Sequence, residues 1–269
     1  MPCTKTLAAG VAAAALALAA GPASAQGLLE EVEERGALRV GVAEGPPYQY
    51  PDAMTGEYVG LNIDLAEEVA ERLGVELEVV PATWATLITG LEVDQYDVIF
   101  ANLFITPERA ESVAFTEPYD TYGFHVMVSA DSDIQTLEDL NSPDVSFAGV
   151  AGTVEASHPK ELFPEAQVNE LVTDQANAGA TSVLSGQSDA VLVDPGLWRI
   201  LTTQNPSIAE RARLVNGEDE LLKPVSLAYA VEHEDTDMLA FLNEFIGEKV
   251  ADDAIAPARD AWFDRIAQQ

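Results

Sequence analysis

An alternation of strand-like and helical segments most constrains the fold of this chain. The run ALRVGVA (37–43) is typical of a buried strand, and residues 62–73 place apolar side chains at helical spacing before Gly74 ends the pattern. VELEVV (75–80) then alternates as a strand, and a second helix is expected over 83–91. This order predicts a parallel α/β sheet with right-handed crossovers.

The same alternation restarts after Tyr119, which indicates a second unit of similar construction. Gly152 and Thr153 begin a helix directly behind the apolar run VSFAGV (145–150). At 269 residues, the chain can bury one large core or two smaller ones. We expect further strands at 121–130, 166–172, 189–194 and 224–232, and further helices at 174–184, 235–250 and 253–267.

One arginine lies in an unusual setting within DVIFANLFITPER (97–109). The strand-like run 97–103 leads to Thr106, a good helix N-cap, and to Pro107, a good first helical residue. A helix that starts there directs free backbone N–H groups towards whatever Arg109 binds, and such donors with a planar guanidinium make a carboxylate site. The alternative is that Arg109 is a surface side chain paired with one of the many acids.

Polar and aromatic residues recur at the ends of the predicted strands. In open α/β sheets, ligands bind at the carboxyl ends of the strands. The residues that directly follow a predicted strand, or lie in the first turn of the next helix, are Tyr48, Trp84, Phe104, Arg109, Thr153 and Asp194. Their recurrence predicts a ligand-binding cleft between two lobes.

Five motifs resemble, in order and spacing, the periplasmic amino-acid-binding proteins that serve ABC importers, of the solute-binding protein family 3 type. The motifs are GVAEGPPYQY (41–50), the run 56–98, ITPER (105–109), AGTVE (151–155) and SGQSDAVLVD (185–194). The resemblance implies an α/β, two-lobe periplasmic-binding-protein fold of type II. It also implies two hinge crossover strands, near 120–129 and 224–231.

The first residues and the resemblance together set the expected organisation of the chain. The apolar stretch 7–20 and a small-residue cleavage site at 23–25 predict a signal peptide over residues 1–25, and a transmembrane anchor is the less favoured alternative. By resemblance, lobe 1 is discontinuous and comprises residues 26–122 and 226–269. Lobe 2 then spans residues 123–225.

The resemblance also implies roles for individual residues in the cleft. Arg109 would clamp a ligand carboxylate, and Thr106, which caps the same helix, is expected among the ligand-binding residues beside it. Thr153 would add a hydroxyl and a helix N-terminus from the other lobe. Asp194 would take the ligand's α-ammonium, and Glu44 at the cleft mouth would take a cationic group. The alternative for both Thr153 and Asp194 is a plain N-cap.

Three aromatic residues bear on the identity of the ligand. Tyr48 and Trp84 fall where the family commonly places ligand-stacking residues, whereas Phe104 replaces the usual Ser or Thr. Beside Glu44 and Arg109, an aromatic box of these three suits a substituted cation through cation–π contact. The pattern resembles the ectoine- and hydroxyectoine-binding branch, so these solutes are the first expectation. The alternatives are a polar or other amino acid as the ligand, and simple core packing for Phe104.

The sequence disfavours an enzyme. Cyclohexadienyl dehydratases resemble the same family, but their glutamate three residues after the second-lobe aspartate corresponds here to Leu197. His125, His158 and His233 are scattered and no P-loop is present, so no metal site or cofactor is expected. We therefore expect a binding protein that works with separate ABC permease subunits. A sensory receptor with its own partner chain is the alternative.

Acidic residues dominate the charge of the chain. Asp and Glu total 46 against 13 Lys and Arg, which gives a formal net charge of −33. Such a charge repels nucleic acid and anionic membranes, and a monomer is expected. The acids are spread throughout, which suits high salt and predicts a halophilic source. Because Cys3 precedes the apolar stretch, the exported chain is expected to lack cysteine and to need no disulfide in the periplasm.

Overall fold

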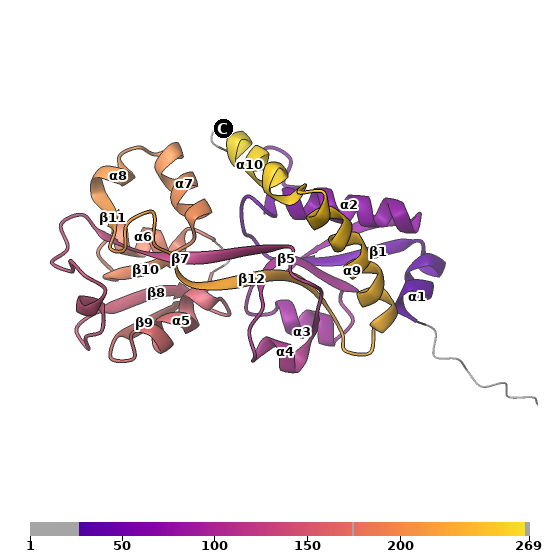
Figure 1. Cartoon of the computed structure of the whole chain (residues 1–269), viewed down its shortest axis with the longest axis horizontal. Coiled ribbons are helices and arrows are strands. Elements are labelled where there is room, and N and C mark those ends of the chain that lie inside the picture. The colour runs from indigo at the N-terminus through magenta and orange to yellow at the C-terminus, as the bar shows by residue number, and fades with distance from the viewer. Residues whose placement is uncertain (1–26, 174, 267–269) are drawn as a thin grey trace, which may run out of the picture.

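The computed structural model describes residues 27–173 and 175–266, which form two α/β lobes joined by two long strands (Figure 1). Each lobe is built on three parallel strands. In the first lobe these are β4 (Glu76–Pro81), β1 (Ala37–Val42) and β5 (Val98–Phe104), and in the second they are β9 (Gln167–Leu171), β8 (Ser146–Val150) and β10 (Ala190–Val193). The predicted signal peptide, residues 1–25, lies outside the described residues.

Two long antiparallel strands, β7 (Asp120–Ser129) and β12 (Leu222–Val231), run between the lobes. Strand β12 pairs with β5 and β7 pairs with β10, so one strand order, β4-β1-β5-β12-β7-β10-β8-β9, continues through the molecule. The predicted two-lobe α/β architecture with two crossover strands is confirmed. Because both strands belong to both lobes, the predicted boundaries of lobe 1 and lobe 2 stay a prediction.

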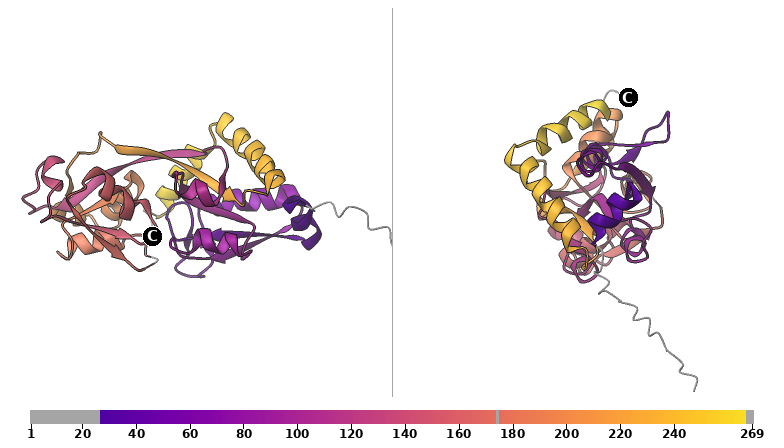
Figure 2. Two further views of the ribbon diagram at one scale, coloured as in Figure 1. Left: turned by 90° about the horizontal axis from the view of Figure 1, so that it is seen from below. Right: turned by 90° about the vertical axis from the view of Figure 1, so that its right-hand side faces the viewer.

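Helices flank the sheet of each lobe, and Figure 2 shows the first of the two C-terminal helices along the first lobe, whereas the second runs towards the other lobe. The first lobe carries α1 (Leu28–Arg35), α2 (Leu61–Leu73), α3 (Leu87–Glu92), α4 (Arg109–Ser112), α9 (Thr236–Ala251) and α10 (Ile255–Ile266). The second carries the 3-10 turn η1 (Glu138–Leu140), α5 (Val154–Leu162), α6 (Ala178–Leu184), α7 (Pro195–Gln204) and α8 (Ile208–Arg211). Short strands are β2 (Tyr50–Pro51), β3 (Tyr58–Val59), β6 (Ala114–Phe115) and β11 (Ala212–Leu214).

Helix α2 shows how the sequence determines one of these elements. Leu65, Ala66 and Val69 are buried, as expected for the apolar stripe of a 3.6-residue repeat. Gly74 follows the last turn with a φ of 70°, a left-handed conformation that glycine adopts at little cost, and its N–H donates back to the carbonyl of Ala70. The pattern therefore determines both the buried face of the helix and its end.

Several predicted helix starts differ from the structure. The helix predicted over 83–91 begins at Leu87, and the helix predicted over 253–267 begins at Ile255. The helix predicted over 174–184 begins at Ala178, and residue 174 itself is not described. The helix expected to begin at Pro107 begins at Arg109 instead, because residues 107 and 108 form a turn. It spans four residues, Arg109–Ser112. Thr106 still caps this turn, since its Oγ1 accepts a hydrogen bond from the backbone N–H of Arg109 at 3.2 Å.

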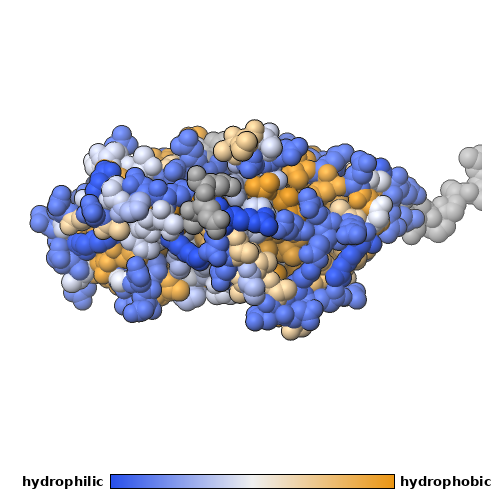
Figure 3. All heavy atoms as spheres, turned by 90° about the horizontal axis from the view of Figure 1, so that it is seen from above, coloured by the Kyte–Doolittle hydropathy of each residue, from blue (hydrophilic) through white to orange (hydrophobic). Residues whose placement is uncertain are grey.

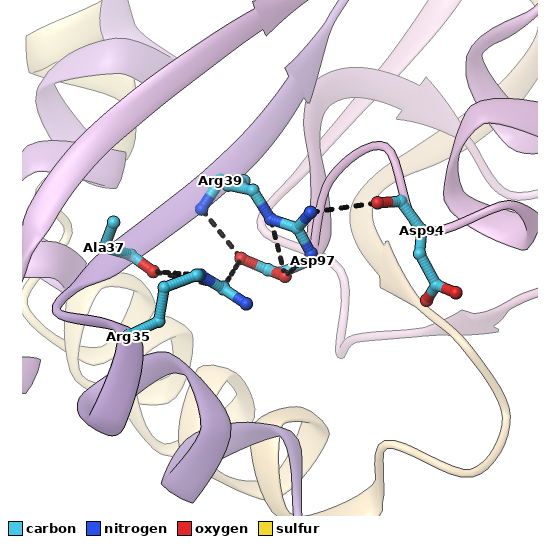
Figure 4. A network of polar contacts seen from close by, with 5 residues as sticks. All are labelled: Arg35, Ala37, Arg39, Asp94 and Asp97. Carbon is cyan, nitrogen blue, oxygen red and sulfur yellow. Dashed lines mark hydrogen bonds and ion pairs between the residues drawn. The ribbon is translucent and has the colours of Figure 1, made fainter.

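A buried carboxylate fastens the start of β5 to α1 and β1 (Figure 4). The Asp97 side chain is 1% exposed and pairs with Arg35 and, at 2.6 Å, with Arg39. It also accepts the backbone N–H of Arg39 at 2.8 Å, and the Arg39 guanidinium donates to the carbonyl of Asp94 at 2.9 Å. A carboxylate this deeply buried needs such partners, so Asp97 holds β5 in register with its neighbour.

The outer surface is largely hydrophilic on the face seen in Figure 3, where apolar residues gather mainly over the first lobe. Large hydrophobic side chains that stand exposed are scattered along the chain: Met54, Val93, Val172, Leu221 and Val250. Within residues 27–173 and 175–266, no helix is long and apolar enough to cross a membrane.

Candidate functional site

A cavity with about 750 Å³ of empty space, its open mouth included, lies between the two lobes. Its walls come from the segments that follow the parallel strands, where α/β sheets bind ligands. The polar and aromatic residues of the first-lobe wall are Glu44, Trp84, Asn102, Phe104 and Arg109. Those facing them from the second lobe include Thr153, Glu155 and Asp194, with Leu197 beside them. Six of the eight residues predicted for the site therefore line one cavity.

Arg109 connects the two lobes. It is the first residue of α4, and its Nη1 donates to the carbonyl of Phe104 at 2.8 Å. Its Nη2 donates to the carbonyl of Gly152, in the second lobe, at 2.9 Å. Burial lowers the pKa of Arg109, and the nearby charges of Glu155 and Glu108 raise it. Arginine side chains keep their positive charge in proteins. The cavity thus holds a fixed cation that both lobes position.

The lobes also touch through their backbones at Gly152. This residue has a φ of +84°, and a Cβ placed on it would lie 2.6 Å from the Cα of Ala85 and 2.8 Å from the carbonyl carbon of Trp84. A contact that short excludes any side chain at this position. The structure therefore represents a closed arrangement of the lobes, in which the loop before α5 abuts the loop before α3.

Thr153 and Asp194 each stand at the N-cap of a second-lobe helix. The Thr153 hydroxyl donates to the carbonyl of Val150 at 2.8 Å, so towards a ligand its oxygen can only accept a hydrogen bond. Asp194 accepts the backbone N–H of Leu197 at 2.9 Å. Asp194 therefore serves as the N-cap of α7 and lines the cavity at the same time.

Glu155 is a cavity residue whose role sequence reasoning missed, although it closes the quoted motif AGTVE. It is the second residue of α5 and lies beside Thr153 and Arg109. Burial raises the pKa of Glu155, hydrogen bonds to its own N–H and to Thr153 lower it, the charge of Asp194 raises it, and the charge of Arg109 lowers it. Burial likewise raises the pKa of Asp194. The sequence could have indicated Glu155 by its position, because the first turn of a helix that starts at the cleft faces the cleft.

The aromatic residues divide between the cavity and the core. Trp84 lines the cavity and its Nε1 donates to the carbonyl of Glu44 at 2.9 Å. Phe104 lines the cavity and also packs edge-to-face on Phe124, with ring centroids 5.4 Å apart, so it serves in both places.

Tyr48 does not line this cavity. It is 2% exposed, its hydroxyl donates to Asp120 at 3.0 Å, and its ring packs edge-to-face against Tyr119 and Tyr122. The expected three-membered aromatic box therefore has two members at the cavity, Trp84 and Phe104. Thr106 also lies outside the lining and acts through the backbone of Arg109.

A buried polar chain supports the first-lobe wall. Asn102 lines the cavity and its Oδ1 accepts from Nε2 of Gln49 at 2.7 Å, while Gln49 in turn accepts from Asn62 at 2.9 Å. The Tyr229 hydroxyl donates to Asn62 at 2.9 Å. Because Gln49 and Asn62 are fully buried, their mutual bonds fix the amide of Asn102, a further residue that the sequence patterns did not indicate.

Among the residues that the structure describes, no group of three or more His, Cys, Asp or Glu side chains is arranged to hold a metal ion. Leu197, the position at which the resemblance implies a glutamate in the dehydratases, lines the cavity with an apolar side chain. Binding without a metal or cofactor stays a prediction.

Two α/β lobes, two crossover strands and a charged cavity between them define a two-lobe solute-binding protein of the type II periplasmic-binding class. The family model for bacterial extracellular solute-binding proteins, family 3, matches residues 38–265, and the chain belongs to this family. The resemblance inferred from the motifs is thereby confirmed at the level of the family.

Individual relatives agree with the fold and the family. The L-cystine-binding protein TcyJ of Escherichia coli K12 is 28% identical over 244 residues, 88% of this chain and 86% of the relative. A variant of arginine-bound ArgBP from T. maritima is 33% identical with a TM-score of 0.72, over 82% of this chain and 99% of that structure. Cyclohexadienyl dehydratase of Pseudomonas aeruginosa is 27% identical over 186 residues, 67% of both chains. None of these relatives supports the expected ectoine branch.

Proposed function

We propose that this protein is an extracytoplasmic receptor that captures an amino acid by hinge closure and presents it to the permease of an ABC importer. The observation that carries the proposal is Arg109, which reaches from the first lobe to the Gly152 carbonyl of the second at the wall of the cavity. A ligand on this guanidinium contacts both sides of the hinge.

The ligand's two charged groups match the two charged walls. Its α-carboxylate binds Arg109 and lies at the N-terminus of α5, beside Thr153. Its α-ammonium binds Asp194 at the start of α7. Because these groups belong to different lobes, the ligand has more contacts in the closed form than in the open form, and it shifts the population towards closure. The closed form is the one that docks on the permease.

The relatives favour an amino acid over ectoine as the first ligand class to test. One matched relative is named for L-cystine and one matched structure is arginine-bound. Ectoine and hydroxyectoine remain comparison ligands, because Trp84 and Phe104 still offer two aromatic faces to a substituted cation. With Leu197 in the place of an acid, dehydration is not part of the proposal. We also propose that the protein is a monomer and acts in the periplasm.

A thermal-shift screen of the purified protein tests this function. The panel contains the twenty amino acids, cystine, ectoine, hydroxyectoine and prephenate. A ligand of micromolar affinity at millimolar concentration stabilises the folded state by roughly 4 kcal/mol, which is a shift of several degrees in Tm. Stabilisation by amino acids supports the proposal. Stabilisation by ectoines alone, or turnover of prephenate, contradicts it.

Substitution of the arginine tests the site. Arg109→Ala leaves a ligand carboxylate buried without its partner, which costs about 3–5 kcal/mol and removes binding at micromolar concentrations. Arg72→Ala is the matched control, because Arg72 lies on α2 and pairs with Glu248 at 2.6 Å away from the cavity. Calorimetric titration with the ligand found in the screen measures both. Micromolar affinity retained in Arg109→Ala would falsify the assignment.

A further inference from the structure

The amide of Asn102 stands at the ligand cavity in a fixed orientation. Asn102 lies on β5, two residues before Phe104, and both residues line the cavity. Its side chain is the last member of the buried polar chain, where it meets Nε2 of Gln49 at 2.7 Å. The oxygen and the nitrogen of an amide have nearly the same shape, so the hydrogen-bond partners decide which of the two atoms points towards the cavity.

A backbone carbonyl sets the orientation of every amide in this chain. The Ala43 carbonyl oxygen can only accept, and Nε2 of Gln49 lies 2.6 Å from it, so this atom of Gln49 is the NH2 group. The Gln49 oxygen then accepts from Nδ2 of Asn62 at 2.9 Å, which leaves the Asn62 oxygen for the Tyr229 hydroxyl. Because the NH2 group of Gln49 also contacts Asn102, the contacting atom of Asn102 is its oxygen. Reversal of one amide would place donor against donor inside a buried network.

The nitrogen of Asn102 is therefore the part of the amide that a ligand meets. Within residues 27–173 and 175–266, no hydrogen bond engages this Nδ2, and it is not one of the fully buried side-chain atoms that lack a partner. An amide NH2 group donates and cannot accept. The first-lobe wall thus presents a hydrogen-bond donor to the cavity, on the side that Trp84 and Phe104 also line.

We infer that Asn102 determines specificity by donating a hydrogen bond to the ligand's side chain, and that the ligand is an amino acid with an uncharged side chain that ends in a carbonyl oxygen, of the glutamine and citrulline class. The inference rests on the proposed function, in which Arg109 and Asp194 bind the α-carboxylate and the α-ammonium. It adds the chemistry of the side chain, which those two residues leave open.

The second lobe offers this carbonyl oxygen no comparable donor. Apart from the residues at the starts of α5 and α7, its wall is apolar and is formed by Gly149, Val150, Ala176, Gly179, Ala180 and Val191. A side chain that carries an acceptor therefore finds its partner on the first lobe, at Asn102. The hydrocarbon part of the same side chain packs on the apolar wall.

Other kinds of side chain fit this lining less well. A second carboxylate on the ligand would share the closed cavity with Glu155 and Asp194, whose negative charges repel it. The side chain of lysine carries only donors, so it meets the NH2 group of Asn102 without an acceptor. An apolar side chain leaves this NH2 group unpaired once the closed cavity has lost its water, and an unpaired buried donor weakens binding.

Glutamine and homoleucine are matched ligands, because homoleucine replaces the carboxamide with an isopropyl group of the same shape. By isothermal titration, we expect the unmodified protein to bind glutamine about tenfold more tightly or better, because homoleucine leaves the donor unpaired in a dry site. Equal affinity for the two ligands overturns the inference, and this comparison needs no variant to fold.

A second pair of ligands tests Asn102 itself. Methionine sulfoxide carries on its δ sulfur the oxygen that glutamine carries on its δ carbon, and it has no N–H group that could reverse the bond. Asn102→Asp keeps the oxygen that Gln49 needs and replaces the NH2 group with a second acceptor. The affinity for methionine sulfoxide relative to methionine should therefore fall about tenfold or more in this variant.

A control with the same change of charge keeps the outcomes distinct. Asn243→Asp lies in the first lobe outside the cavity, and its Oδ1 still accepts the backbone N–H of Glu117 at 2.7 Å, so the ratio should not change. An equal loss of affinity for methionine and its sulfoxide in Asn102→Asp overturns the inference, because the amide would then bind a group that all amino acids share. If no amino acid binds the unmodified protein, the proposed function fails rather than the choice of side chain.

Discussion

Gly152 is the residue at which local conformation and lobe closure depend on each other. Its φ of +84° disfavours any side chain, and a Cβ would lie 2.6 Å from the Cα of Ala85 in the other lobe. Gly152→Ala should therefore prevent full closure and weaken ligand binding at least tenfold. Titration calorimetry measures the affinity, and small-angle scattering with saturating ligand shows whether the compact form is lost.

A second glycine distinguishes the effect of backbone strain from that of a steric clash between the lobes. Gly186 also has a positive φ, +71°, but no atom lies within 4 Å of the position of its Cβ. Gly186→Ala should destabilise the fold by about 1 kcal/mol through backbone strain alone and leave the affinity unchanged. If both variants lose affinity equally, contact between the lobes at Gly152 is not what couples this loop to binding.

At the scale of elements, Asp97 determines how β5 joins the first lobe. Asp97→Asn leaves Arg35 and Arg39 facing a neutral amide in a buried position, which should lower the free energy of unfolding by about 2–4 kcal/mol. Urea unfolding measures the change. Asp94→Asn is the control, because Arg39 bonds to the backbone carbonyl of Asp94 and not to its carboxylate. Equal losses in the two variants would contradict a role for the Asp97 carboxylate.

The sequence predicted elements better than the direction of side chains. Alternating apolar runs located β1, β4, β5, β7 and β12 because each strand carries its own pattern. Tyr48 follows β1 as predicted, but the loop folds back through a bridge between Gly45 and Gln49 and directs the ring into the core. No local pattern encodes that reversal, because it depends on a partner, Asp120, that is distant in the sequence.

At the scale of the molecule, α10 links the two lobes away from the ligand cavity. Trp262 fastens α10 to α2 through Asp64 at 2.7 Å, and Phe263 packs so closely on α7 that a Cβ on Gly196 would lie 2.3 Å from its ring. Arg199 and Asp264 add an ion pair at 2.7 Å. Because α7 begins beside Asp194, we expect this contact to stabilise the closed arrangement of the lobes.

Loss of this contact should weaken binding at a distance. Phe263→Ala is expected to favour the open form by about 1 kcal/mol and so raise the Kd of the ligand about fivefold, although Phe263 does not line the cavity. Scattering without ligand should show a more extended average shape. Val250→Ala, at an exposed site on α9, is the control. An unchanged Kd with a lowered Tm would restrict Phe263 to a role in folding.

The charge of the whole chain leads to a prediction about salt. With a formal net charge of −33 spread along the chain, repulsion between acids opposes the compact state. Because the screening length falls from about 10 Å at 0.1 M to about 3 Å at 1 M, added sodium chloride should raise the Tm. Tetramethylammonium chloride screens equally and should act alike, whereas sucrose at matched osmolality reports water exclusion alone. If sucrose raises the Tm as much as the salts do, the effect comes from exclusion of the solute from the protein surface and not from charge screening. The acidic charge would then give no physical reason to expect a halophilic source.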